Sequence, residues 1–505
     1  MKKLFNKGVK QYLKLRYKRI ERMRNTPIEL QETTFASLLK RAKGTEYGKK
    51  YKFSQITDHA SFTKNVPLID YEAVKPYINR MMKGESNVLW PGSIKWYAKS
   101  SGTTNDRSKF IPVSEDSFYK NNVAASWDTM AITYHEDPKS EIFQKKSLIM
   151  GGALSQWEHN SKVTVGDISA ILLHRMPAVG RPFYSPDFKT ACLHDWEEKI
   201  RLMSQICSKD DIVMFGGVPT WTIVLFKRIL RATGAKNMHE VWPNVKYYMH
   251  GGVGFGPYID QFKEFFPDPS FKYFEVYNAS EGYFGVQDRS NEKGMLLLLD
   301  NDIYYEFIPM EELVNNAPKS ITLSEVTLNT NYAIVISSSA GLWRYMPGDT
   351  VEFSSIKPYR ISVSGRTKHF INVFGEEVMV GDTDKAIAET LNALPAVVAD
   401  YTVAPIFMNH GSKGGHQWLI EFEKKPDSLE AFELLLDDNL QKINSDYAAK
   451  RYKDMALKRL QIVPVSPGTF LRWLTSKGKV GGQNKVPRLF NSRKYIDELM
   501  SFVKD

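Results

Sequence analysis

The sequence predicts an α/β protein with a large N-terminal domain, containing mixed sheets and a strand-rich subdomain, and a smaller α+β C-terminal domain. Three observations lead to this fold class. The chain has 505 residues, more than one ordinary hydrophobic core accommodates. From Ser93 onward, short strand-like runs alternate with helical runs, which is typical of α/β proteins. Beyond Gly365 a separate compact α+β pattern begins, so we expect domains at 1–365 and 366–505.

The N-terminal segment is predicted to be a basic amphipathic helix. Residues 1–24 hold ten Lys or Arg and one acidic residue, Glu21, and so supply most of the net charge of +11. Because the rest of the chain is nearly neutral, no nucleic-acid partner is expected for the protein as a whole. A solvated surface helix is one interpretation, and peripheral contact with a membrane or nucleic acid is the other. The sequence does not identify the partner of this helix.

Aliphatic runs are short, as in "MLLLL" at 295–299, whereas a membrane-spanning helix needs roughly 18 apolar residues. No transmembrane segment is therefore expected. The two cysteines, Cys192 and Cys207, form no CxxC motif, and this usage fits a reducing cytoplasm.

Several strand candidates each run into Gly or Ser: "KSLIMGGAL", "DIVMFGG", "VKYYMHGG" and "KYFEVYNAS". The run "PTWTIVLFKRILRATG" between two of them is predicted to be a helix that ends at Gly234. Strands that alternate with helices favour a largely parallel sheet, whose ligand site lies where the carboxyl ends of the strands meet loops. The later runs "GLWRYMPGDTVEFSS" and "PYRISVSGRTKHFINVFGEEVMV" predict the strand-rich region.

The stretch "KSSGTTNDRSKF" (99–110) predicts a polar turn between the strand-like runs "IKWYA" and "KFIPV". Its glycine lets the backbone approach a ligand, and backbone N–H groups with hydroxyls can hold phosphate oxygens. Because no GxxxxGK[ST] motif is present, a Ser/Thr-rich turn without a ligand is the alternative. The candidate phosphate contacts are Ser100, Ser101, Gly102, Thr103, Thr104 and Lys109.

Three later motifs carry further candidates. In "VYNASEG", the Tyr277 ring could stack on a base, the Ser280 hydroxyl could bind phosphate, and the Glu281 carboxylate is a hard-oxygen ligand suited to Mg²⁺. In "LWRYMPGDTVEF", Asp349 could accept hydrogen bonds from ribose hydroxyls, although Gly-Asp between strands is most often only a turn. In "GGQNKVPRLF", Lys485 lies in a glycine-bearing loop where a solvated lysine is the simpler interpretation.

Taken together, the motifs of this chain resemble those of the adenylate-forming superfamily of acyl-CoA synthetases, peptide synthetase adenylation domains and luciferases. The motifs are, in this order, SSGTT…K, YNASEG, GLWRYMPGD, GRTKHFINVFGE and NKVPR. More narrowly, the sequence is similar to the auxin-responsive Gretchen Hagen family of acyl acid amido synthetases. The segments "TEYGKKYKFSQI", "VPLIDYEAVKPYI" and "LWPG" extend the resemblance over nearly the whole chain.

The resemblance implies ATP-dependent activation of a carboxylic acid as an acyl-adenylate, followed by transfer to an amine, usually of an amino acid. ATP and Mg²⁺ are the implied cofactors, and a mobile C-terminal domain would rotate between the two steps. An acyl-CoA ligase and a degenerate nucleotide-binding regulatory protein remain alternatives. The implied residue roles are as follows: Ser100, Ser101, Gly102, Thr103, Thr104 and Lys109 at the phosphates; Tyr277, Ser280 and Tyr345 at the nucleotide; Asp349 at the ribose; Glu281 at Mg²⁺; Arg366 and Lys368 at the hinge; and Lys485 as the catalytic lysine.

Two departures from the family pattern stand out. Asn105 and Asp106 occupy positions where family members often carry glycine, and both residue types tolerate left-handed backbone better than most. Met346 replaces a frequent arginine, and Arg344 is the candidate substitute.

The acyl pocket is harder to predict. Phe215, Trp221 and Val253 are the candidates for lining it, and core packing is the alternative for each. His250 is interpreted as structural.

Overall fold

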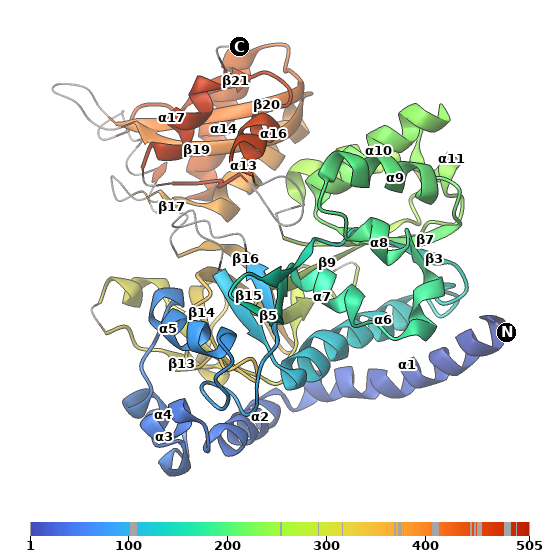
Figure 1. The fold of residues 1–505 in the computed structure, drawn as a ribbon. Coiled ribbons are helices and arrows are strands. Elements are labelled where there is room, and N and C mark those ends of the chain that lie inside the picture. Colours follow the sequence, from blue (N-terminus) through green and yellow to red (C-terminus); the bar gives the residue numbers. More distant parts are fainter. Residues whose placement is uncertain are drawn as a thin grey trace. The chain divides into compact units, whose positions relative to one another are not determined.

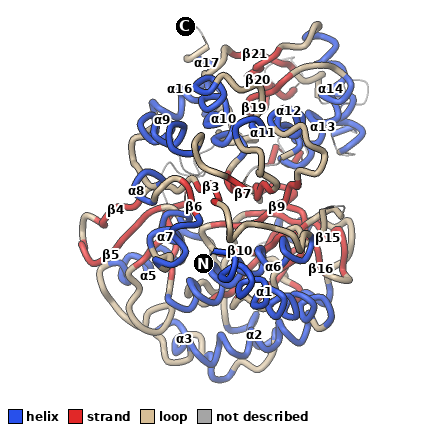
Figure 2. Tube along the Cα trace, turned by 90° about the vertical axis from the view of Figure 1, so that its right-hand side faces the viewer, coloured by secondary structure: helices blue, strands red, loops and turns tan. Residues whose placement is uncertain are grey.

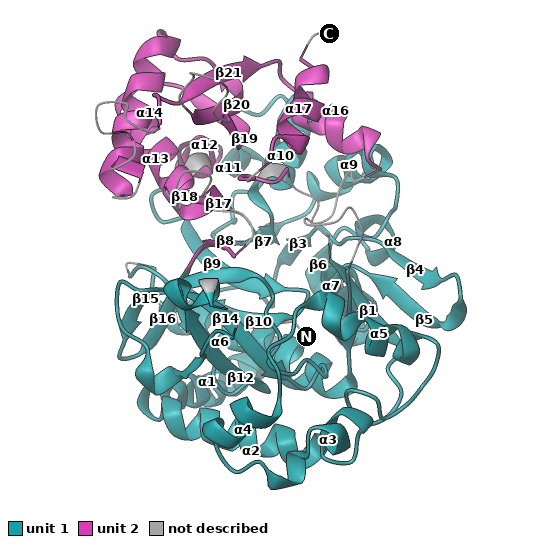
Figure 3. Cartoon of the chain, turned by 90° about the vertical axis from the view of Figure 1, so that its left-hand side faces the viewer, with its two compact units in different colours: residues 1–252, 268–362 teal, residues 253–267, 363–505 magenta. Residues whose placement is uncertain are grey.

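The computed structural model describes residues 2–100, 109–252, 255–290, 292–315, 317–367, 370–371, 376, 378–406, 414–444, 447–448, 451, 457–478, 486–490 and 492–503 (Figure 1). The chain divides into two compact units, coloured separately in Figure 3. Unit 1 comprises residues 1–252 and 268–362, and unit 2 comprises residues 253–267 and 363–505. The sequence placed 253–267 in the larger domain, whereas the contacts of this segment assign it to the smaller unit.

Unit 1 contains a long mixed sheet. Its strands, in spatial order, are β13 (Ile321–Thr322), β12 (Ile303–Pro309), β14 (Asn331–Ser338), β15 (Asp349–Ile356), β16 (Tyr359–Arg366), β11 (Met295–Leu297), β10 (Gly282–Val286), β9 (Lys272–Ala279), β8 (Tyr247–His250), β7 (Ile212–Gly217), β3 (Lys146–Ile149) and β6 (Tyr184–Ser185). The strands from β9 to β6 are parallel, and the pairs assigned from β13 to β9 are antiparallel. The predicted strands β3, β7, β8 and β9 are therefore parallel, whereas the sheet as a whole is mixed rather than largely parallel. The predicted strand-rich region supplies β15 and β16 of the antiparallel part.

A second, smaller sheet in unit 1 has the order β2 (Lys109–Val113), β1 (Trp96–Ser100), β5 (Asn160–Gly166) and β4 (Leu154–Trp157). The strands β1 and β2 are antiparallel, and β1 and β5 are parallel. The polar stretch at 101–108 lies outside the described residues, but both flanking strands form where the sequence predicts them.

Helices cover both faces of the parallel strands in Figures 1 and 2. On β7, successive side chains point to opposite faces: Met214 joins a buried cluster with α1 and α6, whereas Phe215 packs against Phe226 of α10. The predicted helix before Gly234 is confirmed as α10, which begins with Pro219 and ends where Gly234 adopts φ +73°. The helices of unit 1 are α1 (Lys2–Asn25), α2 (Pro27–Ala42), α3 (Glu46–Lys50), α4 (His59–Asn65), α5 (Tyr71–Met82), α6 (Ala124–Glu136), α7 (Ile168–His174), α8 (Phe188–Ala191), α9 (Trp196–Cys207), α10 (Pro219–Thr233) and α11 (Met238–Val241).

Unit 2 is an α+β unit around a three-stranded sheet. Strand β20 (Gly415–Lys424) lies between antiparallel β19 (Val397–Ile406) and parallel β21 (Gln461–Val465). One buried cluster joins this sheet to α13 (Val380–Ala393) and α14 (Leu429–Ile443). The remaining elements are α12 (Ile259–Phe265), β17 (Phe370–Ile371), β18 (Val378–Met379), α16 (Thr469–Ser476) and α17 (Lys494–Ser501). No described helix is long and apolar enough to cross a membrane.

Candidate active site

The motif "VYNASEG" forms the turn between β9 and β10. Ala279 pairs with Gly282, so Ser280 and Glu281 are the two residues of a tight hairpin turn at the carboxyl end of β9. Ser280 is buried and Glu281 is partly exposed. The turn thus fixes a hydroxyl and a carboxylate at adjacent positions next to the parallel half of the sheet, where α/β proteins bind ligands.

Tyr345 lies beside this turn in the segment between β14 and β15. Its backbone exchanges two hydrogen bonds of 2.9 Å with Ile336, and the next residue donates to the carbonyl of Ile69. The side chain is fully buried, and its hydroxyl has no hydrogen-bond partner in the described part of the chain. Burial raises the pKa of Tyr345 well above its ordinary value, and the nearby charge of Glu281 adds to this effect. A buried phenol without a partner, next to a carboxylate, is suited to donate to a ligand oxygen.

Asp349 is the first residue of β15 and is buried. Its Oδ2 accepts a 2.6 Å hydrogen bond from the Tyr277 hydroxyl, while the Tyr277 ring packs edge-on against Phe284 with centroids 4.8 Å apart. Gly348, at φ +94°, provides the left-handed backbone that turns the chain into β15. The motif "LWRYMPGDTVEF" is therefore folded onto the motif "VYNASEG", as a shared ligand would require.

Lys109, the first described residue after the polar stretch 101–108, lies beside Tyr71 in the same region. Tyr71, the first residue of α5, accepts a 2.8 Å hydrogen bond from the amide of Phe110, and the Lys109 ammonium lies 5.8 Å from the Tyr71 ring centre. Burial raises the pKa of Tyr71, and the charge of Glu281 contributes to the rise. The charge of Glu281 therefore acts on both Tyr71 and Tyr345, which places β2, α5 and the β9–β10 turn around one locus.

Glu281 supplies the hard-oxygen donor that Mg²⁺ prefers, and the charges of Asp70 and Asp349 also act on Tyr345. No group of three or more potential ligands among the described His, Cys, Asp and Glu residues is arranged to hold a metal without a substrate. The donor set fits a divalent cation that shares its coordination with phosphate oxygens.

Several predicted site residues lie outside the described residues: Ser101, Gly102, Thr103, Thr104, Val253, Lys368 and Lys485. Ser100 is described at the end of β1, and Arg366 at the end of β16. The roles of all these residues remain predictions.

Of the predicted acyl-pocket residues, Phe215 is fully buried and stacks on Tyr248 with centroids 4.5 Å apart. Trp221 packs edge-on against Trp196 at 4.5 Å, and its indole nitrogen is buried without a hydrogen-bond partner in the described part of the chain. Both therefore contribute to aromatic packing around α10, and their contact with a substrate stays a prediction.

Arg344 does not take the place of the arginine that family members often carry at position 346. It is buried, and its Nε lies 3.1 Å from the fully buried carboxylate of Glu306. Its other nitrogens donate to the carbonyls of Thr63 and Val66 and to the hydroxyl of Ser320. The guanidinium is thus committed to a structural network.

Sequence reasoning missed a partly buried charge cluster beside β1. Asp167 follows β5, the parallel neighbour of β1, and its carboxylate accepts a 3.0 Å hydrogen bond from the amide of Ala153. An ideal Cβ at Gly152 would lie 1.7 Å from Asp167 Oδ2, so glycine is required there. Burial raises the pKa of Asp167, while the charges of Lys199 and Lys99 oppose the rise. The double glycine of "KSLIMGGAL" was the available signal, because it permits this close approach.

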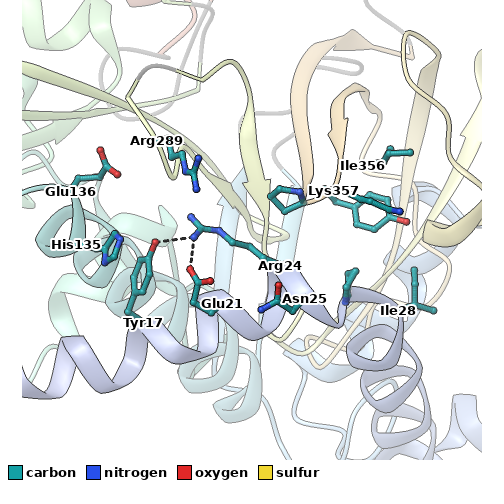
Figure 4. Close-up of a pocket in the computed structure, with 13 residues that line it drawn as sticks. Tyr17, Glu21, Arg24, Asn25, Ile28, His135, Glu136, Arg289, Ile356 and Lys357 are labelled. Atoms are coloured by element: carbon teal, nitrogen blue, oxygen red, sulfur yellow. Dashed lines mark hydrogen bonds and ion pairs between the residues drawn. The ribbon is translucent and has the colours of Figure 1, made fainter.

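A separate cavity of about 650 Å³ lies at the other end of β15 (Figure 4). Ile356 and Lys357 line it on one side, and Tyr17 and Arg24 of α1 on another. Because β15 is eight residues long, Asp349 lies roughly 23 Å from Ile356. This cavity is therefore distinct from the candidate site.

Comparisons with known proteins cover nearly the whole chain. The GH3 family N-terminal domain matches residues 16–218 and 189–271, the central domain 296–366, and the C-terminal domain 381–494. Curated relatives include a 4-substituted benzoates-glutamate ligase, GH3.12, of Arabidopsis thaliana, which is 23% identical over 94% of this chain and 95% of that protein. Another is the jasmonoyl-L-amino acid synthetase JAR4 of Nicotiana attenuata, 24% identical over 91% of this chain and 90% of that protein.

Solved structures confirm the fold class. A GH3.15 acyl acid amido synthetase matches with a TM-score of 0.78 at 18% identity, covering 98% of this chain and 96% of that chain. A 2-hydroxyisobutyryl-CoA ligase in the postadenylation state matches with a TM-score of 0.60 at 14% identity, covering 94% of this chain and 91% of that chain.

Proposed function

The chain belongs to the GH3 family, and on this premise we propose that it is an ATP-dependent ligase that joins a carboxylic acid to an amine through an acyl-adenylate. The amine is that of an amino acid, as the names of the curated relatives suggest. ATP is the co-substrate, and Mg²⁺ is the cation that accompanies it.

The observation that carries this proposal is the convergence of two motifs on one locus. Tyr277 and the Ser280–Glu281 turn come from one motif, and Asp349 and Tyr345, whose hydroxyl has no hydrogen-bond partner among the described residues, come from the other. The charges of Glu281 and Asp349 both act on Tyr345, which supports the placement of all three around one nucleotide. In this proposal Asp349 binds the ribose, Tyr277 the base, and Ser280 the α-phosphate.

The chemistry requires positioning and charge neutralisation, without a protein nucleophile. A carboxylate oxygen of the acid attacks the α-phosphorus of ATP, and pyrophosphate leaves. The amine nitrogen then attacks the acyl carbonyl, loses a proton and displaces AMP. Mg²⁺ held by Glu281 would neutralise phosphate charge in the first step.

The first half-reaction further depends, in this proposal, on groups outside the described residues. Ser101, Gly102, Thr103 and Thr104 would hold the phosphates together with Ser100 and Lys109, and Lys485 would approach the α-phosphate and the carboxylate. Arg366 and Lys368 would lie at the hinge of a smaller domain, 366–505, that changes orientation between the two half-reactions. A cytoplasmic location completes the proposal and is consistent with the two free cysteines, Cys192 and Cys207.

Carboxylate-dependent exchange of labelled pyrophosphate into ATP tests the first half-reaction. A panel of aromatic, fatty and amino acids should contain at least one acid that supports exchange. No exchange with any acid would overturn the enzymatic proposal in favour of a regulatory nucleotide-binding protein. Supplying amino acids and coenzyme A in parallel, with identification of the products by mass spectrometry, then separates amide formation from thioester formation. A thioester alone would assign the chain an acyl-CoA ligase activity.

The Lys485→Ala variant tests the assigned catalytic lysine. Exchange should fall by at least about a hundredfold while ATP binding changes little, because the ammonium would act mainly on charge in the transition state. Lys458→Ala, at an exposed lysine of the same unit, is the matched control. Equal turnover in the two variants would refute the role of Lys485.

A further inference from the structure

The helix α1 has an inward face that is held to unit 1. Leu13, Ile20 and Met23 are buried in the cluster formed with α6 and the parallel strands, and Figure 1 shows α1 running beside α6. Cations on this side are paired: Arg16 Nε lies 2.8 Å from Asp128 Oδ1, and Arg24 Nη2 lies 2.6 Å from Asp288 Oδ2.

Figure 4 shows the end of this inward face. Arg24 there also donates to the Tyr17 hydroxyl and to Glu21. Arg16 and Arg24, on the inward face, are therefore paired with acidic side chains of unit 1.

The outward face of α1 carries a stripe of cations. Lys7, Lys14, Lys18 and Arg22 are all exposed, and their spacings of seven, four and four residues place them on one side of the helix. None of these four side chains makes a hydrogen bond or ion pair with another described residue. With a rise of 1.5 Å per residue, the stripe is about 22 Å long.

Two exposed apolar side chains flank the stripe on one side. Leu15 is 55% exposed and lies beside Lys18 and Arg22 around the helix. Tyr12, one turn before Leu15 and farther from the stripe, is 45% exposed; its ring packs edge-on against Trp127 with centroids 5.3 Å apart, and its hydroxyl accepts a 3.2 Å hydrogen bond from Arg16. Exposed leucine and tyrosine side chains at the border of a row of cations are typical of a surface that binds the membrane interface.

We propose that the outward face of α1 docks the protein onto the surface of a membrane that contains anionic phospholipids. Lys7, Lys14, Lys18 and Arg22 would meet lipid phosphates and carboxylates, while Leu15 and Tyr12 enter the headgroup region. The straight stripe can contact a plane along its whole length. Because no described helix is suited to cross the bilayer, this association is peripheral.

The exposed apolar pair favours lipid over nucleic acid as the occupant. A nucleic-acid backbone offers phosphate to the four cations but no apolar layer to Leu15, whereas the bilayer interface takes both kinds of side chain. The charge is also local: residues 1–24 hold ten Lys or Arg against one acidic residue, in a chain of net charge +11.

The test is sedimentation of the full-length chain with vesicles of phosphatidylcholine, with and without phosphatidylserine. Each cation near an anionic surface contributes about fivefold to the partition coefficient at low salt. The quadruple variant Lys7→Gln, Lys14→Gln, Lys18→Gln and Arg22→Gln should therefore lose at least about a hundredfold of its binding to phosphatidylserine vesicles. The matched control neutralises four exposed lysines elsewhere in unit 1, by Lys40→Gln, Lys43→Gln, Lys83→Gln and Lys95→Gln, and should bind like the unmodified chain.

A second variant separates the apolar contribution from the electrostatic one. Leu15→Ser should weaken vesicle binding several-fold without changing its dependence on salt, because the charge is unaltered. The quadruple variant should retain pyrophosphate exchange in the absence of vesicles, which excludes misfolding as the cause of lost binding.

Three results would overturn the proposal. One is equal loss of binding in the quadruple variant and its control, and another is equal binding of the unmodified chain to neutral and anionic vesicles. The third is stripe-dependent binding that is stronger for a DNA duplex than for anionic vesicles and is insensitive to Leu15→Ser, which would assign the face to nucleic acid.

Discussion

The Tyr277 hydroxyl donates a 2.6 Å hydrogen bond to Asp349 and so connects β9 with the start of β15. Tyr277→Phe removes this bond but keeps the ring that packs against Phe284. Because a hydrogen bond to a charged group contributes about 1.5–3 kcal/mol, we expect the KM for ATP to rise at least about tenfold in the exchange assay while kcat changes less. Asp349→Ala should raise the KM further, since it removes the ribose contact itself. An unchanged KM in both variants would contradict the assigned ribose site.

Glu281 is expected to govern the Mg²⁺ requirement. Glu281→Gln removes the negative charge from the β9–β10 turn while preserving size and hydrogen-bonding shape. We expect pyrophosphate exchange to fall by at least about a hundredfold and to recover in part at high Mg²⁺, because the metal affinity would be weakened. Titration of exchange against Mg²⁺ measures this effect. Ser280→Ala is the comparison, because loss of an α-phosphate contact should lower exchange without shifting its dependence on Mg²⁺. Identical Mg²⁺ curves for Glu281→Gln and the unmodified chain would exclude Glu281 as a ligand.

The ion pair between Arg344 and Glu306 is expected to contribute to stability rather than to nucleotide binding. Arg344→Met removes the guanidinium from the fully buried carboxylate of Glu306 and leaves it only the contacts with His59 and Ser320, which should lower the free energy of unfolding by about 3–5 kcal/mol. Thermal unfolding checks this effect, and adding Glu306→Gln should restore part of the loss. The control is Arg80→Met, because Arg80 pairs with Glu46 and Glu85 at an exposed position and its loss should change the melting temperature much less. A large increase in the KM for ATP without a loss of stability would instead support the family-like role.

His250 should make stability sensitive to acid. Burial lowers its pKa from 6.5 to about 3. The unfolded chain therefore binds a proton between these two values while the folded chain does not. The stabilising contribution is complete above pH 6.5 and is lost as the pH falls toward 3, by at most about 1.4 kcal/mol per pH unit. In His250→Gln the melting temperature should fall less between pH 7 and pH 5 than in the unmodified chain. Parallel pH profiles for the two proteins would refute this assignment.

Sequence patterns located the regular elements of the parallel sheet well. The strands β3, β7, β8 and β9 form where apolar runs meet Gly or Ser, and Gly234 ends α10 as its left-handed backbone requires. These features are local, since a residue's own neighbours along the chain determine them. The turn at Ser280–Glu281 and the start of β15 at Asp349 could be located from the sequence for the same reason.

Long-range partners could not be predicted in this way. The assignment of Arg344 failed because its partner Glu306 lies 38 residues earlier, on β12, and no periodicity links the two. Asp167 was missed because its position beside β1 depends on the parallel pairing of β1 with β5 and on the close approach of Gly152, which follows β3. Both concern charged side chains that are at least partly buried, whose partners are determined by tertiary packing.

The segment 253–267 has a consequence for protein engineering. Within unit 2, the Tyr258 hydroxyl accepts a 2.7 Å hydrogen bond from Arg488, and Gln261 donates to Glu423 at 2.7 Å. The backbone therefore passes between the units at three points: 252–253, 267–268 and 362–363. A hybrid ligase that exchanges only the residues after 365 would combine Tyr258 and Gln261 from one parent with their partners from the other. Recombination between relatives would preserve these contacts only if two separate cassettes, 253–267 and 363–505, are inherited together.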